Sequence, residues 1–272
     1  MSRESDAAEI TRRNFQTSDD VRLSFLEALP DGAGSDELTI AFIPGWSMPA
    51  SLWRNQLEYF GSHYHSVALD PRGQGESDVP GSGYTAERRA ADLHEFLRPF
   101  RKVLLVGWSL GAIESLQLIH SFPSENIAAL ALIDSSVGEG PAPPPGGKFP
   151  EELRKDRYQA LRSFVRAMFK TKLPEAELDD LVRSAERMSV EASIALLSYP
   201  FERTHWRDIA RGFHKPLLYV VTPQFQAQAL DLRKNRAGTR IEIFRNAGHA
   251  LFVDEPQRFN TVLESFARTV AK

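Results

Sequence analysis

The sequence predicts an α/β fold with a doubly wound, mostly parallel sheet. Strand-like runs alternate with helix-like segments along most of the chain, the strand-like runs are almost continuously apolar, and a hairpin-like pair precedes them. Nearly continuous apolar strands are typical of parallel sheets that helices cover on both faces. The chain has 272 residues, which is enough for one large domain or for a core with an insertion.

The core elements follow in order. Two strands are expected at residues 9–16 and 21–28, and the turn-prone segment 17–20 between them predicts a hairpin. The further strands are expected at 38–43, 65–69, 103–106, 127–133, 216–221 and 240–244. The core helices are expected at 51–60, 85–100, 112–121, 226–234 and 256–270.

A helical cap is expected to be inserted after strand 6. Residues 138–147 (GEGPAPPPGG) are rich in proline and glycine, which indicates a stiff linker. Apolar residues at helical spacing then predict one helix over 151–170. Further helices are expected at 175–188, 190–197 and 206–211. The expected division is a core of residues 1–137 and 213–272, with the linker and cap at 138–212.

Composition narrows the possible partners. Hydrophobic residues make up 42% and charged residues 25%, and a net charge of -3 gives no basic surface for nucleic acid or an anionic membrane. No apolar run is long enough to span a bilayer, and residues 1–14 lack the apolar stretch of a signal peptide. The absence of cysteine excludes disulfides and thiolate zinc sites and is compatible with the cytosol. We expect a cytoplasmic protein without metal or cofactor; its oligomeric state stays open.

The segment Gly107-Trp108-Ser109-Leu110-Gly111 lies between an expected strand and an expected helix. This is a G-x-S-x-G pattern in the context that a nucleophilic serine requires, so Ser109 is the candidate nucleophile. Only small residues at 107 and 111 leave room for a serine at the apex of such a tight turn.

A serine hydroxyl is a poor nucleophile at neutral pH, so Ser109 requires a base and an acid that orients the base. His249 lies in the loop just after the last strand, in the segment Asn246-Ala247-Gly248-His249. Open parallel sheets place their sites outside the carboxyl ends of the strands, which brings His249 to the same edge as Ser109. His249 is therefore the candidate base.

At this point the chain resembles an α/β-hydrolase over nearly its whole length. The resemblance rests on the Gly107–Gly111 motif, on the segment that ends at His249, and on the segment Asp70-Pro71-Arg72-Gly73-Gln74-Gly75-Glu76-Ser77 after the fourth strand. That last segment is similar to the D-x-R-G-x-G-x-S turn of the family. Asp70 and Arg72 are expected to brace this loop rather than to react.

The resemblance implies an oxyanion hole made of two main-chain N–H groups, those of Leu110 and Trp46. Many relatives carry His-Gly before the second donor, whereas this chain reads Pro44-Gly45-Trp46. Proline has no N–H, but it is not the donor, and its stiffness is one substitute for the hydrogen bonds of the missing histidine.

The acid has more than one candidate. Family members commonly place it just after the seventh strand, where this chain reads Thr222-Pro223-Gln224-Phe225-Gln226 without a carboxylate. Asp134, at the end of the sixth strand, is the preferred alternative, because haloalkane dehalogenases and certain lipases carry their acid there. Asp231 on the following helix is a second alternative, and a Ser-His dyad or a water in place of the acid is a third.

The cap is expected to cover the site and to line an acyl or alkyl pocket. The candidate wall residues are Trp46, Met48, Trp108, Leu251 and Phe252.

These features predict a serine hydrolase that acts on a small-molecule ester, lactone or thioester through an acyl-enzyme on Ser109. Serine at this position argues against dehalogenase and epoxide hydrolase chemistry, which uses aspartate there. Lyase, C–C hydrolase and perhydrolase activities use the same residues and stay open. The alternative from another class is a ligand-binding or receptor-like scaffold with weak or no turnover, and it is favoured if Asp134 lies beyond reach of His249.

Overall fold

The computed structural model describes residues 8–30, 38–142 and 147–271. Residues 1–7 of the N-terminal segment and 143–146 of the expected linker lie outside this part. The strands are β1 (Ile10–Gln16), β2 (Arg22–Ala28), β3 (Thr39–Ile43), β4 (His65–Asp70), β5 (Val103–Trp108), β6 (Ile127–Ile133), β7 (Leu217–Val221) and β8 (Thr239–Ile243).

The helices connect these strands and cover the sheet. They are η1 (Ala50–Trp53), α1 (Arg54–Phe60), α2 (Ala86–Leu97), α3 (Leu110–Ser121), α4 (Phe149–Lys155), α5 (Arg157–Ala167), α6 (Glu175–Ala185), α7 (Val190–Ala195), α8 (Arg203–Gly212), η2 (Pro223–Phe225), α9 (Gln226–Asn235), α10 (Leu251–Asp254) and α11 (Pro256–Ala271).

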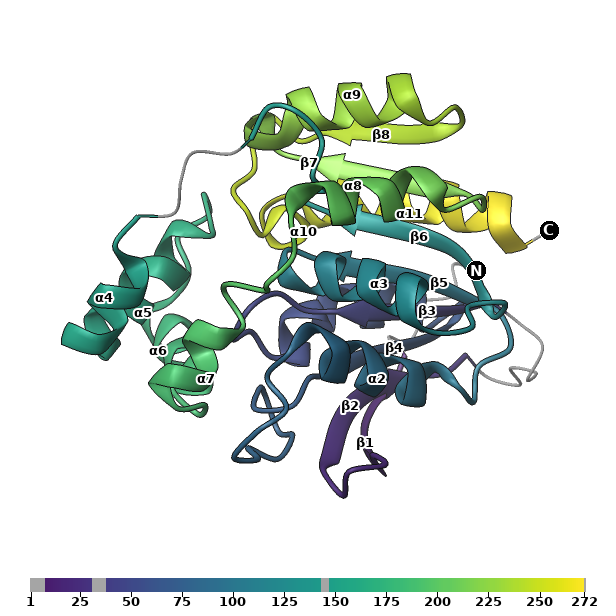
Figure 1. Cartoon of the computed structure of the whole chain (residues 1–272). Coiled ribbons are helices and arrows are strands. Elements are labelled where there is room, and N and C mark those ends of the chain that lie inside the picture. The colour runs from purple at the N-terminus through teal and green to yellow at the C-terminus, as the bar shows by residue number, and fades with distance from the viewer. Residues whose placement is uncertain (1–7, 31–37, 143–146, 272) are drawn as a thin grey trace.

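All eight strands of the described residues form one sheet in the order β1-β2-β4-β3-β5-β6-β7-β8 (Figure 1). The strand β2 runs antiparallel to β1 and to β4, and every other neighbouring pair is parallel. The predicted hairpin and the mostly parallel sheet are both confirmed.

The sheet has a helical layer on each face. Along β3, Ile40 and Phe42 pack toward α1 and α11, whereas Ala41 and Ile43 pack toward α2, α3 and α8. This alternation follows from the two-residue period of a strand, and because both faces are buried the strand is apolar throughout. The strands are thus continuously apolar because a hydrophobic core lies on each face of the sheet.

Helices α4 to α8 lie between β6 and β7 in the chain. Figure 1 shows α4 to α7 standing apart from the two layers that cover the sheet, whereas α8 runs beside α3. His205 of α8 lies 2.8 Å from the side-chain oxygen of Gln117 in α3, which ties α8 to the core layer. The division at residue 212 stays a prediction, and we call α4 to α7 the inserted helices.

The single helix predicted over 151–170 is wrong, because the structure has two helices, α4 and α5, that meet at Asp156. Asp156 has φ -151° and ψ 86°, and its carboxylate accepts a hydrogen bond from the N–H of Gln159. An aspartate at this position caps the second helix and ends the first. The apolar spacing continues across the break, which is why the sequence pattern missed it.

A buried ion cluster fixes the loop that follows β4. Arg72 is 1% exposed, and its guanidinium donates two hydrogen bonds to Asp92 of α2, at 2.6 and 2.7 Å. It also donates to Asp19 at 3.0 Å, and this hydrogen bond lowers the pKa of Asp19 to about 2. Arg72 thus joins the loop after β4 to α2 and to the turn between β1 and β2.

Replacing Arg72 with methionine is expected to lower the free energy of unfolding by about 3 kcal/mol, because the buried Asp92 carboxylate loses its closest partner. Chemical denaturation measures the change. The matched control is Arg268→Met, which removes a pair between the exposed Arg268 and Glu264 on α11 and is expected to leave stability almost unchanged. A loss at Arg72→Met no larger than that of the control would contradict the bracing role.

Candidate active site

Ser109 occupies a tight turn between β5 and α3. It has φ 55° and ψ -117°, a backbone conformation that non-glycine residues rarely adopt. Its N–H donates to the carbonyl of Ile133 in β6 at 2.9 Å, so the turn is held by the neighbouring strand. The structure therefore holds the Ser109 side chain at the carboxyl edge of the sheet.

Gly107 and Gly111 flank this turn, and nearby main-chain atoms leave no space for a side chain at either position. A Cβ at 107 would lie 2.4 Å from the carbonyl oxygen of Gly111, and one at 111 would lie 2.5 Å from that of Ile43. Real Cβ atoms do not approach main-chain atoms so closely. The two glycines are thus a steric requirement of the turn.

Asp134 and His249 are in direct contact. The Nδ1 atom of His249 lies 2.8 Å from Oδ2 of Asp134, whose side chain is 1% exposed at the end of β6. A carboxylate at Nδ1 fixes the tautomer in which Nε2 is free to accept a proton. No hydrogen bond joins Ser109 Oγ to His249 among the described residues; such bonds often tighten only when substrate binds.

The turn after β7, which lacks the usual acid, contacts Asp134 through its backbone. The N–H of Thr222 donates to Oδ1 of Asp134 at 2.6 Å. The two oxygens of Asp134 are therefore divided between Thr222 and His249. Asp231, the alternative acid, lies on α9, where Asn235 donates to its carboxylate at 3.3 Å.

The loop that carries His249 is fixed by a residue that sequence reasoning missed. Asp254 accepts hydrogen bonds from the N–H groups of Gly248, Lys170 and Thr171 at 2.7, 3.0 and 2.8 Å. Burial tends to raise the pKa of Asp254, but these three donors outweigh it and lower that pKa below its ordinary value. No motif marks Asp254, because its partners follow only from the folded path of two distant segments.

The two expected oxyanion donors belong to segments next to Ser109. Leu110 is the first residue of α3, so its N–H has no acceptor within the helix. Trp46 belongs to a turn closed by the hydrogen bond from Met48 N–H to Gly45 carbonyl, and its own N–H has no acceptor among the described residues. A Cβ at Gly45 would lie 3.1 Å from Ser109 Cβ, so this turn lies against the serine.

The expected wall residues are packed more deeply than a substrate-lining role requires. The side chains of four of them have no exposed surface: Met48, Trp108, Leu251 and Phe252. Phe252 stacks on Trp53 with centroids 3.7 Å apart, and Trp108 donates its indole N–H to the His249 carbonyl at 2.9 Å. In this state their packing supports the loops, and their contact with substrate stays a prediction.

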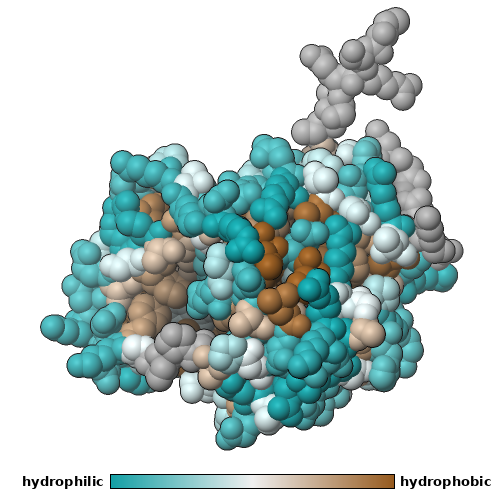
Figure 2. Space-filling model, turned by 90° about the horizontal axis from the view of Figure 1, so that it is seen from above, coloured by the Kyte–Doolittle hydropathy of each residue, from teal (hydrophilic) through white to brown (hydrophobic). Residues whose placement is uncertain are grey.

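Trp46, the fifth of these residues, joins the core to the inserted helices. Its indole N–H donates to the carbonyl of Ser193 in α7 at 2.7 Å. Its ring makes edge contacts with Phe149 and Phe164, at centroid distances of 5.5 and 5.1 Å. Figure 2 shows apolar side chains gathered in a hollow on the side of the molecule where the inserted helices lie.

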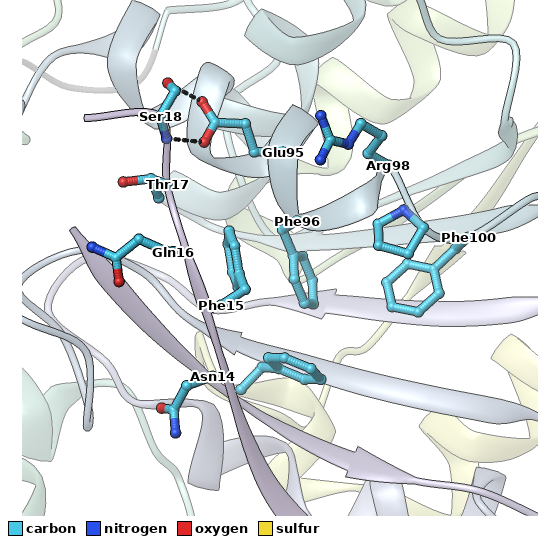
Figure 3. Close-up of a pocket in the computed structure, with 11 residues that line it drawn as sticks. Asn14, Phe15, Gln16, Thr17, Ser18, Glu95, Phe96, Arg98 and Phe100 are labelled. Atoms are coloured by element: carbon cyan, nitrogen blue, oxygen red, sulfur yellow. Dashed lines mark hydrogen bonds between the residues drawn. The ribbon is translucent and has the colours of Figure 1, made fainter. Parts of the chain in front are cut away.

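A separate cavity of about 440 Å³ lies between β1 and the end of α2 (Figure 3). Aromatic side chains, Phe15 and Phe96 among them, form one wall, and Ser18 closes another by donating two hydrogen bonds to Glu95 at 2.8 Å. None of the candidate catalytic residues lines it. The cavity is therefore not part of the candidate site.

The helices of the described residues include none that is both long and apolar enough to cross a membrane.

Comparison with known proteins gives consistent matches. A family model described as "Alpha/beta hydrolase family" matches residues 40–262. The chain is 26% identical over 258 residues to a pimeloyl-[acyl-carrier protein] methyl ester esterase of Vibrio vulnificus, covering 87% of this chain and 95% of that protein. It is 28% identical over 264 residues to the enzyme of that name from Aeromonas hydrophila, covering 86% and 96%. A solved esterase from Exiguobacterium antarcticum has the same fold, with a TM-score of 0.81, 22% identity and coverage of 94% and 98%.

Gly111→Ala is expected to lower the free energy of unfolding by about 1–3 kcal/mol, because the added methyl group meets main-chain oxygens that cannot move. Helix propensity alone predicts the opposite sign, a gain of about 1 kcal/mol for alanine within α3. Chemical denaturation distinguishes the two. The control is Gly81→Ala, where a Cβ meets nothing within 4 Å. Equal stability of the two variants would show that the turn tolerates a side chain.

Proposed function

The chain belongs to the alpha/beta hydrolase family, and we propose that it is a serine hydrolase that cleaves carboxylic esters of small or medium acyl groups. In this proposal Ser109 is the nucleophile, His249 the base and Asp134 the acid. The observation that carries it is the 2.8 Å contact between His249 Nδ1 and a buried Asp134 carboxylate. The printed names of the Vibrio and Aeromonas relatives support ester cleavage.

In the acylation step, Ser109 Oγ attacks the carbonyl carbon while His249 Nε2 takes the hydroxyl proton. The imidazolium that forms is stabilised by Asp134, which Thr222 keeps oriented from the other side. The carbonyl oxygen becomes an oxyanion, and the N–H groups of Trp46 and Leu110 stabilise its charge.

The intermediate then collapses. The bond between the carbonyl carbon and the leaving oxygen breaks, His249 donates its proton to that oxygen, and the alcohol departs. A water molecule, deprotonated by His249, attacks the acyl-enzyme and releases the acid with Ser109 restored. A thioester follows the same steps with a thiol as the leaving group. A lactone does so with a leaving hydroxyl that stays attached to the acyl chain until hydrolysis releases the hydroxy acid.

The inserted helices are proposed to cap this site, as part of a linker and cap over 138–212 on a core of 1–137 and 213–272. The contacts of Trp46 with Ser193, Phe149 and Phe164 support a cover over the oxyanion turn. A small-molecule substrate in the cytoplasm fits a chain without cysteine.

The receptor-like alternative rests on the missing acid after β7 and on Pro44, which stands where many relatives have histidine. It requires His249 to lack a carboxylate partner, and the Asp134 contact argues against it. The same contact disfavours Asp231 as the acid and a Ser-His dyad without an acid, because Asp134 already contacts Nδ1 of His249.

The proposal is tested by hydrolysis of short and medium p-nitrophenyl esters and by labelling with a fluorophosphonate. Ser109→Ala is expected to abolish labelling and hydrolysis, and His249→Ala to reduce both to near background. Asp134→Asn is expected to lower kcat by about 10⁴-fold, because the imidazole adopts the wrong tautomer.

The matched control is Asp231→Asn, which changes the other candidate carboxylate and is expected to leave kcat within about twofold, in line with ordinary surface substitutions. Full activity of Asp134→Asn together with loss at Asp231→Asn would move the acid to α9. Absence of labelling and of hydrolysis in the native protein across the ester panel would favour the receptor-like alternative.

A further inference from the structure

Gln74, in the loop after β4, binds the turn that carries Trp46. Its side chain is 0% exposed, and its Nε2 donates to the carbonyls of Gly45 and Met48 at 3.0 and 2.8 Å. Its Oε1 accepts a hydrogen bond from Arg89 at 3.2 Å. Both donors and one acceptor lone pair of this buried amide thus bind the turn and Arg89.

Only an amide satisfies these three partners together. The two carbonyls need donors, whereas the guanidinium of Arg89 needs an acceptor, so the orientation of the Gln74 amide follows from its partners. A carboxylate of the same shape keeps the bond to Arg89, but it has no N–H to donate. Its second oxygen would face the carbonyl oxygens of Gly45 and Met48 and be repelled by them. An apolar side chain of similar length provides neither function.

The carbonyl of Gly45 and the N–H of Trp46 belong to one peptide unit. A trans peptide is planar, and its C=O and N–H point in opposite directions. A hydrogen bond that fixes Gly45 carbonyl therefore also fixes the direction of Trp46 N–H. The second bond, at Met48, holds the other end of the same turn and resists rotation of the peptide about its neighbours.

The Gln74 amide is held in place by Arg89, which belongs to a buried ion pair. Arg89 of α2 forms an ion pair with Glu114 of α3 at 2.9 Å, and both side chains are at most 1% exposed. Tyr199 donates to the same carboxylate at 2.9 Å. Two core helices therefore determine where the Gln74 amide lies.

We propose that Gln74 is a positioning residue for the oxyanion hole, which it serves by directing the Trp46 N–H toward the reacting carbonyl oxygen. The inference rests on the proposed hydrolase function of Ser109. Many relatives have a histidine at the position of Pro44, and this chain lacks the hydrogen bonds of that side chain. The inference assigns to Gln74 the role of holding the turn that carries Trp46. Gln74 itself does not contact the substrate.

The test is Gln74→Glu, assayed on the full chain with a p-nitrophenyl ester. Removal of an oxyanion donor costs about 10²–10³ in kcat, so a donor that is misdirected is expected to cost about 10- to 100-fold. KM is expected to change less than about threefold, because the ground-state carbonyl carries little of the charge that the hole stabilises.

A trifluoromethyl ketone gives an independent readout. It adds to the serine as a tetrahedral hemiketal whose oxyanion occupies the hole, so its Ki is expected to rise by the same factor as kcat falls. Gln74→Met, which lacks both the donor and the new charge, is expected to show the same paired change. It keeps the inference testable if Gln74→Glu fails to fold.

The matched control is Asn126→Asp. Asn126 also donates one amide to two carbonyls of a turn, those of Leu97 and Phe100 at 3.0 and 3.1 Å, but it precedes β6 at the opposite edge of the sheet. Its replacement is expected to lower stability without changing kcat or the ketone Ki by more than about twofold.

The outcomes separate the two levels of the proposal. Unchanged kcat and Ki in Gln74→Glu or Gln74→Met, with an active native protein, would overturn the positioning role and leave the hydrolase proposal intact. So would a change confined to stability, equal to that of Asn126→Asp. A native protein that neither hydrolyses esters nor reacts with the fluorophosphonate would overturn both.

Discussion

The carboxylate of Asp134 connects the parts of the molecule on which the proposed chemistry depends. One oxygen accepts from Thr222, just after β7, and the other contacts His249, after β8, while Asp134 itself directly follows β6. These three strands are neighbours, so the sheet brings together residues that lie far apart in sequence. A carboxylate with 1% exposure is costly unless it is hydrogen-bonded, and the two contacts meet that requirement with groups the site needs anyway. The same two contacts of the Asp134 carboxylate therefore compensate its burial and orient His249.

Much of the fold and part of the site could be predicted from local sequence patterns. Strand positions followed from short apolar runs, because burial on both faces leaves no polar alternation to obscure them. The turn at Ser109 followed from Gly107 and Gly111, whose lack of a Cβ is a local steric requirement that the structure reproduces. His249 followed from the rule that the strands of a parallel sheet end at a common edge. Asp134 followed instead from the resemblance, because some α/β-hydrolases carry their acid after the sixth strand.

What could not be predicted depends on contacts between distant segments. The break at Asp156 interrupts an apolar spacing that runs on through it, so a local pattern cannot locate it. Asp254 accepts a hydrogen bond from the nearby Gly248 but also one from Lys170, which follows α5. Gln74 donates to the carbonyl of Gly45, in a turn from an earlier part of the chain. A buried polar side chain has no periodic signature, and its partners are defined only once the packing is complete.

Trp46 links the proposed oxyanion hole to the inserted helices, because its N–H is the proposed donor while its indole donates to Ser193 and its ring meets Phe164. A movement of these helices that admits substrate must therefore break the Ser193 bond or pull on the turn itself. The Gln74 amide opposes that pull, since its bond to Arg89 anchors it to the core and not to the inserted helices. A turn fixed in this way would keep the direction of its N–H if the bond to Ser193 broke. In the proposed mechanism, the core side of the turn thus keeps the Trp46 N–H directed at the oxyanion, and the indole side contacts the inserted helices.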